Sequence, residues 1–200
     1  MNALNAFELP VLDWIQANLV CPFLDTICPF LSMLCAHGEI WIALALLFLI
    51  FPKTRRMGLG MSVALLLGLI FVNGMLKPLI FRIRPFDFNE ANIAPRIKDL
   101  LFNGTFPPGN LSDGSFPSGH TVASFEACSV MLYLDKRWGI PALSLALFIA
   151  FSRLYLYVHY PTDVLAAIVL GFLFGLVGVL VTKLIYRKVA EKKNKANGTK

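Results

Sequence analysis

Long apolar runs, each close to the length of a membrane-spanning helix, alternate with short polar segments along most of this chain. A helix needs about 20 predominantly apolar residues to cross the hydrocarbon core of a bilayer. Four runs approach or exceed that length, at residues 57–81, 116–134, 140–158 and 163–185. The pattern predicts transmembrane helices joined by short connections.

The first 51 residues are less regular. Residues 3–20 mix apolar positions with Asn, Glu and Asp, which is typical of a helix lying in the membrane interface. Two shorter apolar runs follow at 21–35 and 40–51, and Pro22 and Pro29 interrupt the first of them. Together with the four long runs they predict an all-α, polytopic membrane bundle of about six transmembrane helices.

Polar segments divide the chain into three expected parts. Residues 86–115 are rich in Pro, Gly and Asn, which predicts a folded loop outside the bilayer core. We expect an interfacial helix and first membrane segment at 1–36, a transmembrane core that includes this loop at 37–186, and a basic, solvated tail at 187–200.

Composition supports a membrane protein and argues against a nucleic-acid-binding one. Hydrophobic residues make up 57% of the chain and charged residues only 15%, whereas about a quarter of residues are charged in soluble proteins. The net charge is +6, but the basic residues lie in short loops and in the tail rather than on one folded face. The four cysteines show no metal-ligand spacing and are interpreted as apolar packing residues.

The distribution of lysine and arginine predicts the orientation in the membrane. Cytoplasmic loops carry an excess of basic residues. Of the 18 basic residues, 12 fall at one expected face: Lys53, Arg55, Arg56, Lys136, Arg137, Lys183, Arg187, Lys188, Lys192, Lys193, Lys195 and Lys200. This face is therefore expected to be cytoplasmic, with the C-terminus. The loop at 82–116 and the turns at 117–120 and 158–163 then share the outer face.

The first candidate for chemistry is the basic end of the run at 57–81. Lys77 and Arg84 are seven residues apart, so they share a face if the helix continues past Pro78. No carboxylate lies within this segment to pair with them. An anionic ligand would explain their position; the structural alternative is two side chains that snorkel at a helix end.

The second candidate is the turn Pro117-Ser118-Gly119-His120, which opens an apolar helix. Ser118 suits an N-cap, and the first backbone N–H groups of a helix attract anions such as phosphate. His120 places a titratable group beside them. A purely structural histidine next to a serine cap is the alternative.

The third candidate extends from Ser152-Arg153 to His159 and Asp163. Pro161 fits the first turn of a helix, so Asp163 is expected one turn beyond His159. There it would accept a hydrogen bond from one ring nitrogen and leave the other free to attack. An interfacial Arg, His and Asp cluster without catalytic function is the alternative, but the three stretches together favour a phosphate site.

These three motifs resemble the signature of the type 2 phosphatidic acid phosphatase superfamily, over roughly residues 38–185. The family includes lipid phosphatases, undecaprenyl pyrophosphate phosphatases, bacterial acid phosphatases and vanadium haloperoxidases. The resemblance implies an acid phosphatase and haloperoxidase-like helical core and a hydrolase that needs no metal or other cofactor and acts through a phosphohistidine.

The resemblance also implies roles for individual residues. His159 would be the nucleophile, Asp163 its orienting partner and His120 the general acid. The phosphoryl oxygens would be held by Lys77, Arg84, Arg153, Ser118 and the Gly119 N–H. Two residues depart from the pattern: Tyr157 stands where many relatives have Gly, and Glu126 lies within a helix that usually has small residues there.

The expected function is an integral cell-membrane phosphatase that acts on a lipid phosphate or diphosphate at the outer face. Undecaprenyl pyrophosphate is slightly favoured; phosphatidylglycerol phosphate and phosphatidate are the alternatives within this class. A lipid phosphotransferase, a vanadate-dependent haloperoxidase, and a non-catalytic protein that binds or transports lipid phosphates are alternatives of other classes.

Overall fold

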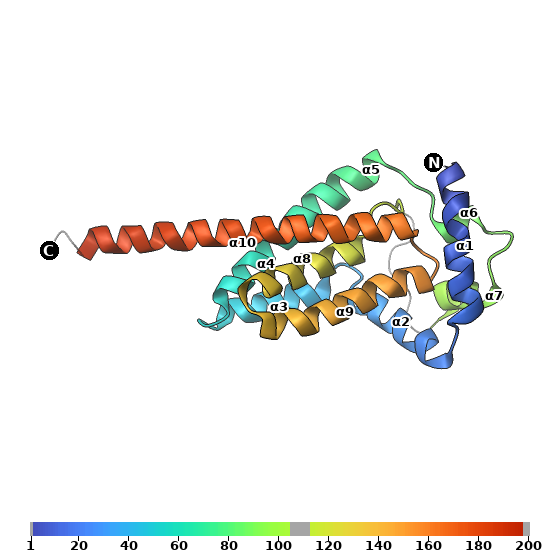
Figure 1. Ribbon diagram of the computed structural model, residues 1–200, viewed down its shortest axis with the longest axis horizontal. Coiled ribbons are helices and arrows are strands. Elements are labelled where there is room, and N and C mark those ends of the chain that lie inside the picture. Colours follow the sequence, from blue (N-terminus) through green and yellow to red (C-terminus); the bar gives the residue numbers. More distant parts are fainter. Residues whose placement is uncertain (1, 105–112, 198–200) are drawn as a thin grey trace.

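Helices make up the regular structure of the protein. The computed structural model describes residues 2–104 and 113–197, which contain helices and no strands (Figure 1). In chain order the elements are α1 (Asn2–Asn18), α2 (Pro22–Leu34), α3 (Glu39–Ile50), α4 (Arg55–Gly68), the π-helical η1 (Leu69–Leu76), α5 (Lys77–Leu79), α6 (Pro85–Phe88), α7 (Pro95–Lys98), the π-helical η2 (Asp99–Asn103), α8 (Gly119–Leu134), α9 (Lys136–Tyr155) and α10 (Pro161–Asn197).

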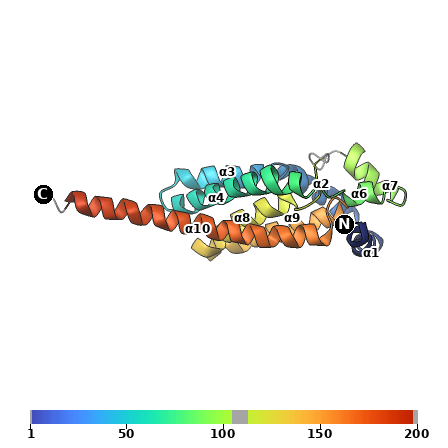
Figure 2. The same cartoon turned by 90° about the horizontal axis from the view of Figure 1, so that it is seen from above.

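Helix α8 is the centre of the bundle. It packs most extensively against α10, α9 and α4, and α3 packs against α4 and donates a hydrogen bond from Trp41 to Ser124 of α8 (Figures 1 and 2). Every side chain from Ser124 to Met131 is buried. Gly171 and Gly175 on α10 allow this approach, because a Cβ at Gly175 would lie 1.7 Å from the Ser129 Oγ. A membrane bundle without strong hydrophobic attraction between its helices relies on such close contacts.

Three helical segments of the described residues are long and apolar enough to cross a membrane: Arg55–Leu79, Lys136–Tyr155 and Pro161–Lys195. The pair Pro22–Leu34 and Glu39–Ile50, bent by 55°, adds a fourth if it counts as one broken span. The expectation of about six spans is therefore not confirmed.

The expected span at 116–134 is shorter in the structure. Helix α8 begins only at Gly119, because Ser118 has extended backbone and serves as the N-cap residue. Its 16 residues extend about 24 Å, less than the roughly 30 Å of a hydrocarbon core. Surrounding helices cover α8, so its length is not set by contact with lipid.

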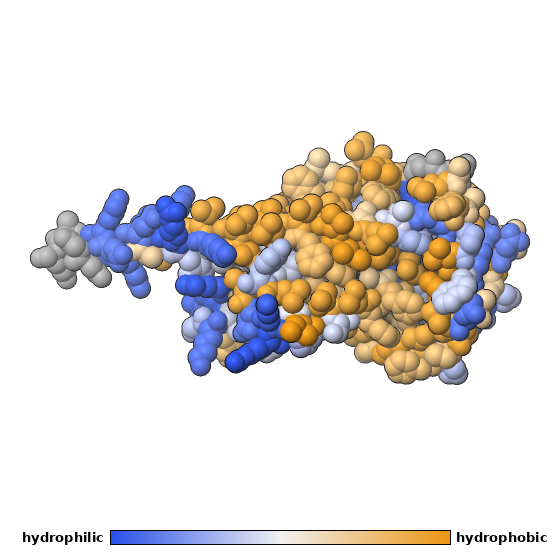
Figure 3. All heavy atoms as spheres, in the orientation of Figure 1, coloured by the Kyte–Doolittle hydropathy of each residue, from blue (hydrophilic) through white to orange (hydrophobic). Residues whose placement is uncertain are grey.

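The two ends of the bundle differ. The C-terminal part of α10 projects as an exposed, lysine-rich helix from one end, and hydrophobic side chains cover much of the face between the two ends (Figure 3). At the opposite end α1 runs transverse to the bundle, next to α6 and α7 (Figures 1 and 2). A second hydrophobic cluster, which includes Leu12, Ile97 and Tyr155, packs α1 and the short helices onto this end.

Candidate active site

Three parts of the chain converge at the end of the bundle that carries α1. The end of η1 with the extended segment before α6 forms one side, the N-terminus of α8 the second, and the connection between α9 and α10 the third. They enclose part of one cavity of about 440 Å³. Of the eight predicted site residues, six line it: Lys77, Arg84, Gly119, His120, Arg153 and His159.

His159 is held with one ring nitrogen available. Its Nδ1 lies 2.8 Å from the Ser115 carbonyl oxygen, which only accepts, so Nδ1 carries the proton. Nε2 is then unprotonated and lies 3.4 Å from Arg84 Nη1. Burial lowers the pKa of His159 well below its ordinary value, and the positive charges of Arg84, Arg153 and Lys77 lower it further. The imidazole is therefore neutral near pH 7, as a nucleophile must be.

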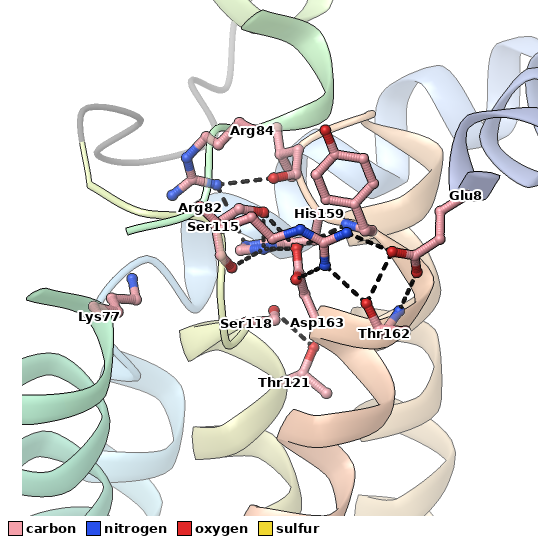
Figure 4. A network of polar contacts seen from close by, with 12 residues as sticks. Glu8, Lys77, Arg82, Arg84, Ser115, Ser118, Thr121, His159, Thr162 and Asp163 are labelled. Atoms are coloured by element: carbon pink, nitrogen blue, oxygen red, sulfur yellow. Dashed lines mark hydrogen bonds and ion pairs between the residues drawn. The ribbon is translucent and has the colours of Figure 1, made fainter. Parts of the chain in front are cut away.

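Asp163 lies beside His159 but does not make the expected hydrogen bond. Its Oδ2 is 3.7 Å from His159 Nδ1, which is too long for a hydrogen bond. That oxygen instead accepts from the Ser115 hydroxyl and from the Tyr160 N–H at 2.9 Å, and Oδ1 accepts from Arg82 Nη1 at 2.5 Å (Figure 4). Ser115 thus contacts both groups: its carbonyl oxygen accepts from the His159 ring, and its hydroxyl donates to Asp163.

A carboxylate that the sequence motifs did not indicate pairs with two of the predicted phosphate ligands. Asp113 contacts Lys77 Nζ through Oδ2 and Arg84 Nη2 through Oδ1, the latter at 2.5 Å. Burial raises the pKa of Asp113, but the hydrogen bonds and charges of Lys77 and Arg84 outweigh this and hold it below its ordinary value. Two anionic oxygens thus lie against the two cations expected to hold phosphoryl oxygens.

Asp113 should therefore compete with phosphate for Lys77 and Arg84. We expect Asp113→Asn to bind orthovanadate about 10-fold more tightly, a change of about 1.4 kcal/mol, because the neutral amide leaves both cations free for the anion. The dissociation constant can be measured by thermal shift with increasing vanadate. Asp99→Asn, which changes an exposed carboxylate in the same loop, is the control. Equal vanadate affinity in wild type and Asp113→Asn would contradict the prediction.

Ser32 on α2 contacts two of the predicted site residues in the cavity wall, His120 and Arg153. The Nε2–H of His120 donates to the Ser32 carbonyl oxygen at 3.0 Å, and Arg153 Nη1 donates to the Ser32 hydroxyl. Arg153 is 1% exposed, and its Nε has no hydrogen-bond partner among the described residues. A buried guanidinium with an unused donor beside a cavity is suited to an anionic ligand.

Ser118 faces away from the cavity. Its hydroxyl pairs with that of Thr121 at 2.9 Å, and its N–H donates to the Asp163 carbonyl oxygen at 3.3 Å (Figure 4). Ser118 thus occupies the N-cap position of α8 without a capping bond from its side chain. Gly119 does line the cavity, and a Cβ there would lie 3.7 Å from Lys77 Nζ.

The sequence departure at Tyr157 coincides with an unusual backbone. Its φ is +60°, in the left-handed region that favours glycine, and costs of the order of 1–2 kcal/mol are typical for other residues there. The side chain is buried, and its hydroxyl donates to Asp13 at 2.6 Å and accepts from Asn89 at 3.0 Å. These contacts compensate for the backbone and hold the turn that carries His159.

Comparison with solved structures supports this fold. The crystal structure of Aquifex aeolicus LpxE matches with a TM-score of 0.68 and 24% identity, over 86% of this chain and 94% of that one. That of a PAP2 type phosphatidylglycerolphosphate phosphatase from Bacillus subtilis matches with a TM-score of 0.62 and 22% identity, over 94% and 89%.

Matches to the sequences of other proteins cover shorter regions of this chain. An undecaprenyl-diphosphatase of Sulfolobus acidocaldarius is 29% identical over 133 residues, and undecaprenyl-diphosphatase BcrC of Bacillus subtilis is 30% identical over 126 residues. They cover 66% and 61% of this chain, which spans 58% of the length of each. A lipid A 1-phosphatase of Rhizobium etli is 31% identical over 109 residues, 54% of this chain and 43% of that protein.

The family model of the PAP2 superfamily matches residues 57–187, which is more than half of the chain and includes all eight predicted site residues. The chain belongs to the PAP2 superfamily.

Proposed function

We propose that this protein is an integral membrane phosphatase that removes phosphate from a lipid phosphate or diphosphate. The observation that carries the proposal is the composition of the 440 Å³ cavity. One end holds three basic side chains and two imidazoles, and the other is lined by apolar residues of α3, α4 and η1. Such a cavity suits a ligand with an anionic head and an apolar tail.

The apolar part of the cavity follows one face of the long α4–η1 helix. Its apolar lining includes Leu65, Leu69 and Val72, at intervals of three and four residues. The lining of the whole cavity continues along the same helix from Ser62 to Lys77 at the start of α5, over about 22 Å. This segment is among those long enough to cross a membrane. A lipid tail in the cavity would therefore lie parallel to this candidate membrane-spanning helix, with its phosphate next to Lys77.

In the proposed reaction, His159 Nε2 attacks phosphorus and the bond to the leaving oxygen breaks. His120 must enter this step as the imidazolium: its Nε2–H stays on the Ser32 carbonyl oxygen, its Nδ1 proton passes to the leaving oxygen, and the ring becomes neutral while the phosphoryl group stays on His159. A water then attacks phosphorus, gives a proton to His120 and releases inorganic phosphate as the N–P bond breaks. Lys77, Arg84 and Arg153 stabilise the charge that spreads over the phosphoryl oxygens, and the carboxylate of Asp163 stabilises the imidazolium.

We favour undecaprenyl diphosphate slightly as the substrate, because two relatives named for that activity match this chain. Phosphatidylglycerol phosphate and phosphatidate are the alternatives. The basic end of the bundle is proposed to be cytoplasmic and the cavity to open on the outer side, since basic residues favour the cytoplasmic side.

The test is phosphate release by the purified protein in detergent from undecaprenyl diphosphate, phosphatidylglycerol phosphate and phosphatidate, with EDTA present. Turnover of at least one lipid in EDTA is expected. Lipid binding without turnover would instead indicate a binding or transport protein, and transfer of the phosphoryl group to an added alcohol in place of water would indicate a phosphotransferase.

The position of Glu126 supports a second candidate substrate, a phosphorylated lipid with acyl groups. Its side chain lines the cavity, is 1% exposed, and has an Oε1 without a hydrogen-bond partner among the described residues. Gly68 makes room for it, since a Cβ there would lie 2.1 Å from Oε1. Glu126 follows His120 by about 9 Å along α8. A carbonyl, hydroxyl or amide group of the lipid at this depth would pair with it, whereas a polyprenyl chain is hydrocarbon there.

Replacing Glu126 with leucine separates the two substrate classes. If an acyl lipid is the substrate, we expect kcat/KM for phosphatidate to fall about 10-fold, the effect of one lost hydrogen bond of about 1.4 kcal/mol, while the value for undecaprenyl diphosphate does not fall. Glu126→Gln, which keeps hydrogen-bonding atoms, is the matched control and should retain phosphatidate turnover. Equal losses with both lipids in Glu126→Leu would contradict a role in substrate choice.

A further inference from the structure

Arg82 is the one basic residue of the segment 77–85 that turns away from the cavity. It is 3% exposed, and its guanidinium lies over the Tyr160 ring at 3.8 Å. Nη1 donates to Asp163 Oδ1 at 2.5 Å and to the Thr162 hydroxyl at 2.8 Å (Figure 4). Arg82 therefore contacts the carboxylate beside His159 without lining the cavity.

The other side of Arg82 is held by the N-terminal helix α1. Nη2 donates to Glu8 Oε2, and Nε donates to Asn5 Oδ1 at 2.8 Å. Glu8 also accepts from the Thr162 N–H at 2.7 Å and from its hydroxyl at 3.0 Å. Since Thr162 lies in the first turn of α10, Glu8 binds one of the free N–H groups of that helix and places a negative charge at its positive end.

These contacts form a continuous chain from α1 to the nucleophile. Glu8, Arg82 and Asp163 are all less than 6% exposed, and removal of one partner leaves an uncompensated buried charge. Asp163 in turn binds the Ser115 hydroxyl, while the Ser115 carbonyl holds His159 Nδ1. The position of the ring thus depends on the position of the carboxylate, and that position depends on Arg82 and Glu8.

We propose that α1 is a supporting part of the active site, with Glu8 and Arg82 as positioning residues that fix Asp163 and, through it, His159. The α1 helix lies outside residues 57–187, which match the family model. The inference rests on the proposed nucleophilic role of His159. It assigns to the N-terminal helix a part in the rate of the chemical step and not only in binding or stability.

A second link allows the structural alternative to be tested. Arg96 contacts Gln16 of α1 and Asp25 of α2, and lies 3.2 Å from the Tyr155 hydroxyl. Arg96 thus fastens α1 through the hydrogen bond to Gln16 and α2 through a half-buried ion pair with Asp25, and no contact of Arg96 with Asp163 or His159 is found among the described residues. Arg96→Gln therefore loosens α1 without altering the chain of contacts to the nucleophile.

The experiment compares Glu8→Gln with Arg96→Gln in the full-length protein in detergent, by steady-state kinetics with the lipid that wild type hydrolyses. We expect Glu8→Gln to lower kcat by about 10-fold to 100-fold, the cost typical of misplacing a reacting group by about 1 Å, with little change in KM because the phosphate-binding cations are intact. Arg96→Gln should keep kcat within about 2-fold of the wild-type value, even if its melting temperature falls as much as that of Glu8→Gln. Arg82→Lys should retain more activity than Arg82→Met, since it keeps the charge.

Hydrogen exchange gives a readout that does not depend on turnover. In Glu8→Gln, the amides of Tyr160 and residues 162–164 should exchange faster than in wild type, and in Arg96→Gln they should exchange at the wild-type rate. Wild-type kcat in Glu8→Gln, or the same kcat loss in both variants at equal stability, would overturn the inference. So would unchanged exchange at these amides in Glu8→Gln, even if the proposed phosphatase activity were absent.

Discussion

Replacement of His159 with alanine should lower kcat for lipid phosphate hydrolysis by about 10⁴-fold or more, the scale seen when a catalytic nucleophile is removed. The physical reason is the geometry of the ring. Its Nδ1–H is fixed on the Ser115 carbonyl oxygen, and Nε2 faces Arg84 in the cavity, so no other described side chain offers a neutral nitrogen in that position. Phosphate release from the preferred lipid measures the loss.

The phosphorylated intermediate provides the control. Rapid acid quenching is avoided because phosphohistidine is labile to acid; denaturation in base after mixing with ³²P-labelled lipid should leave label on wild type and none on His159→Ala. His120→Ala should slow turnover while the label still forms on His159. Label retained by His159→Ala, or hydrolysis at the wild-type rate, would show that another group attacks phosphorus.

The sequence was sufficient to predict which basic and titratable residues meet. Lys77, Arg84, His120, Arg153 and His159 are spread over the chain, and the predicted alternation of helices through a membrane places the ends of their segments on the same side. The local sequence also predicts the helix N-terminus beside His120. The roles assigned to them remain proposals, but the structure does bring these five side chains to one cavity.

The partners of these residues could not be predicted in the same way. Asp113 and Ser115 belong to a segment without a regular hydrophobic period, Ser32 belongs to helix α2, and each makes its contact across 29 or more residues of the chain. Spacing in one sequence carries no information on such pairs. This is also why the apparent lack of a carboxylate near Lys77 was misleading: the partner comes from the loop.

The direction of Arg82 shows a related limit. It lies in the same short basic segment as Lys77 and Arg84, and its identity alone does not distinguish it from them. In the segment between α5 and α6, Arg82 contacts Glu8 of α1, whereas Arg84 lies against His159 in the cavity. Glu8, which from the sequence was only a polar residue of an interfacial helix, supplies its buried partner.

Arg153→Met is expected to separate activity from stability. Arg153 lines the cavity with an Nε that has no partner among the described residues, so it is a donor kept for an anion. Loss of one such donor costs about 10²-fold to 10³-fold in kcat where it stabilises the transition state. The same substitution removes a buried charge whose side-chain hydrogen bond is to the neutral Ser32. An apolar side chain of similar volume removes the cost of keeping that charge out of water, so the ligand-free protein should become more stable.

We therefore expect the ligand-free Arg153→Met protein to melt several degrees above wild type and to lose the further stabilisation that orthovanadate gives wild type, because a ligand stabilises only the state it binds. Arg153→Lys is the matched control: it keeps a positive charge in the cavity wall but not the guanidinium fork, so it should lose activity without the gain in melting temperature. Thermal unfolding followed by tryptophan fluorescence, with and without vanadate, measures both effects. A side chain kept for an anion should cost stability when the anion is absent. If Arg153→Met instead melts below wild type, and its activity falls only in proportion to the folded fraction, Arg153 is a structural residue of α9.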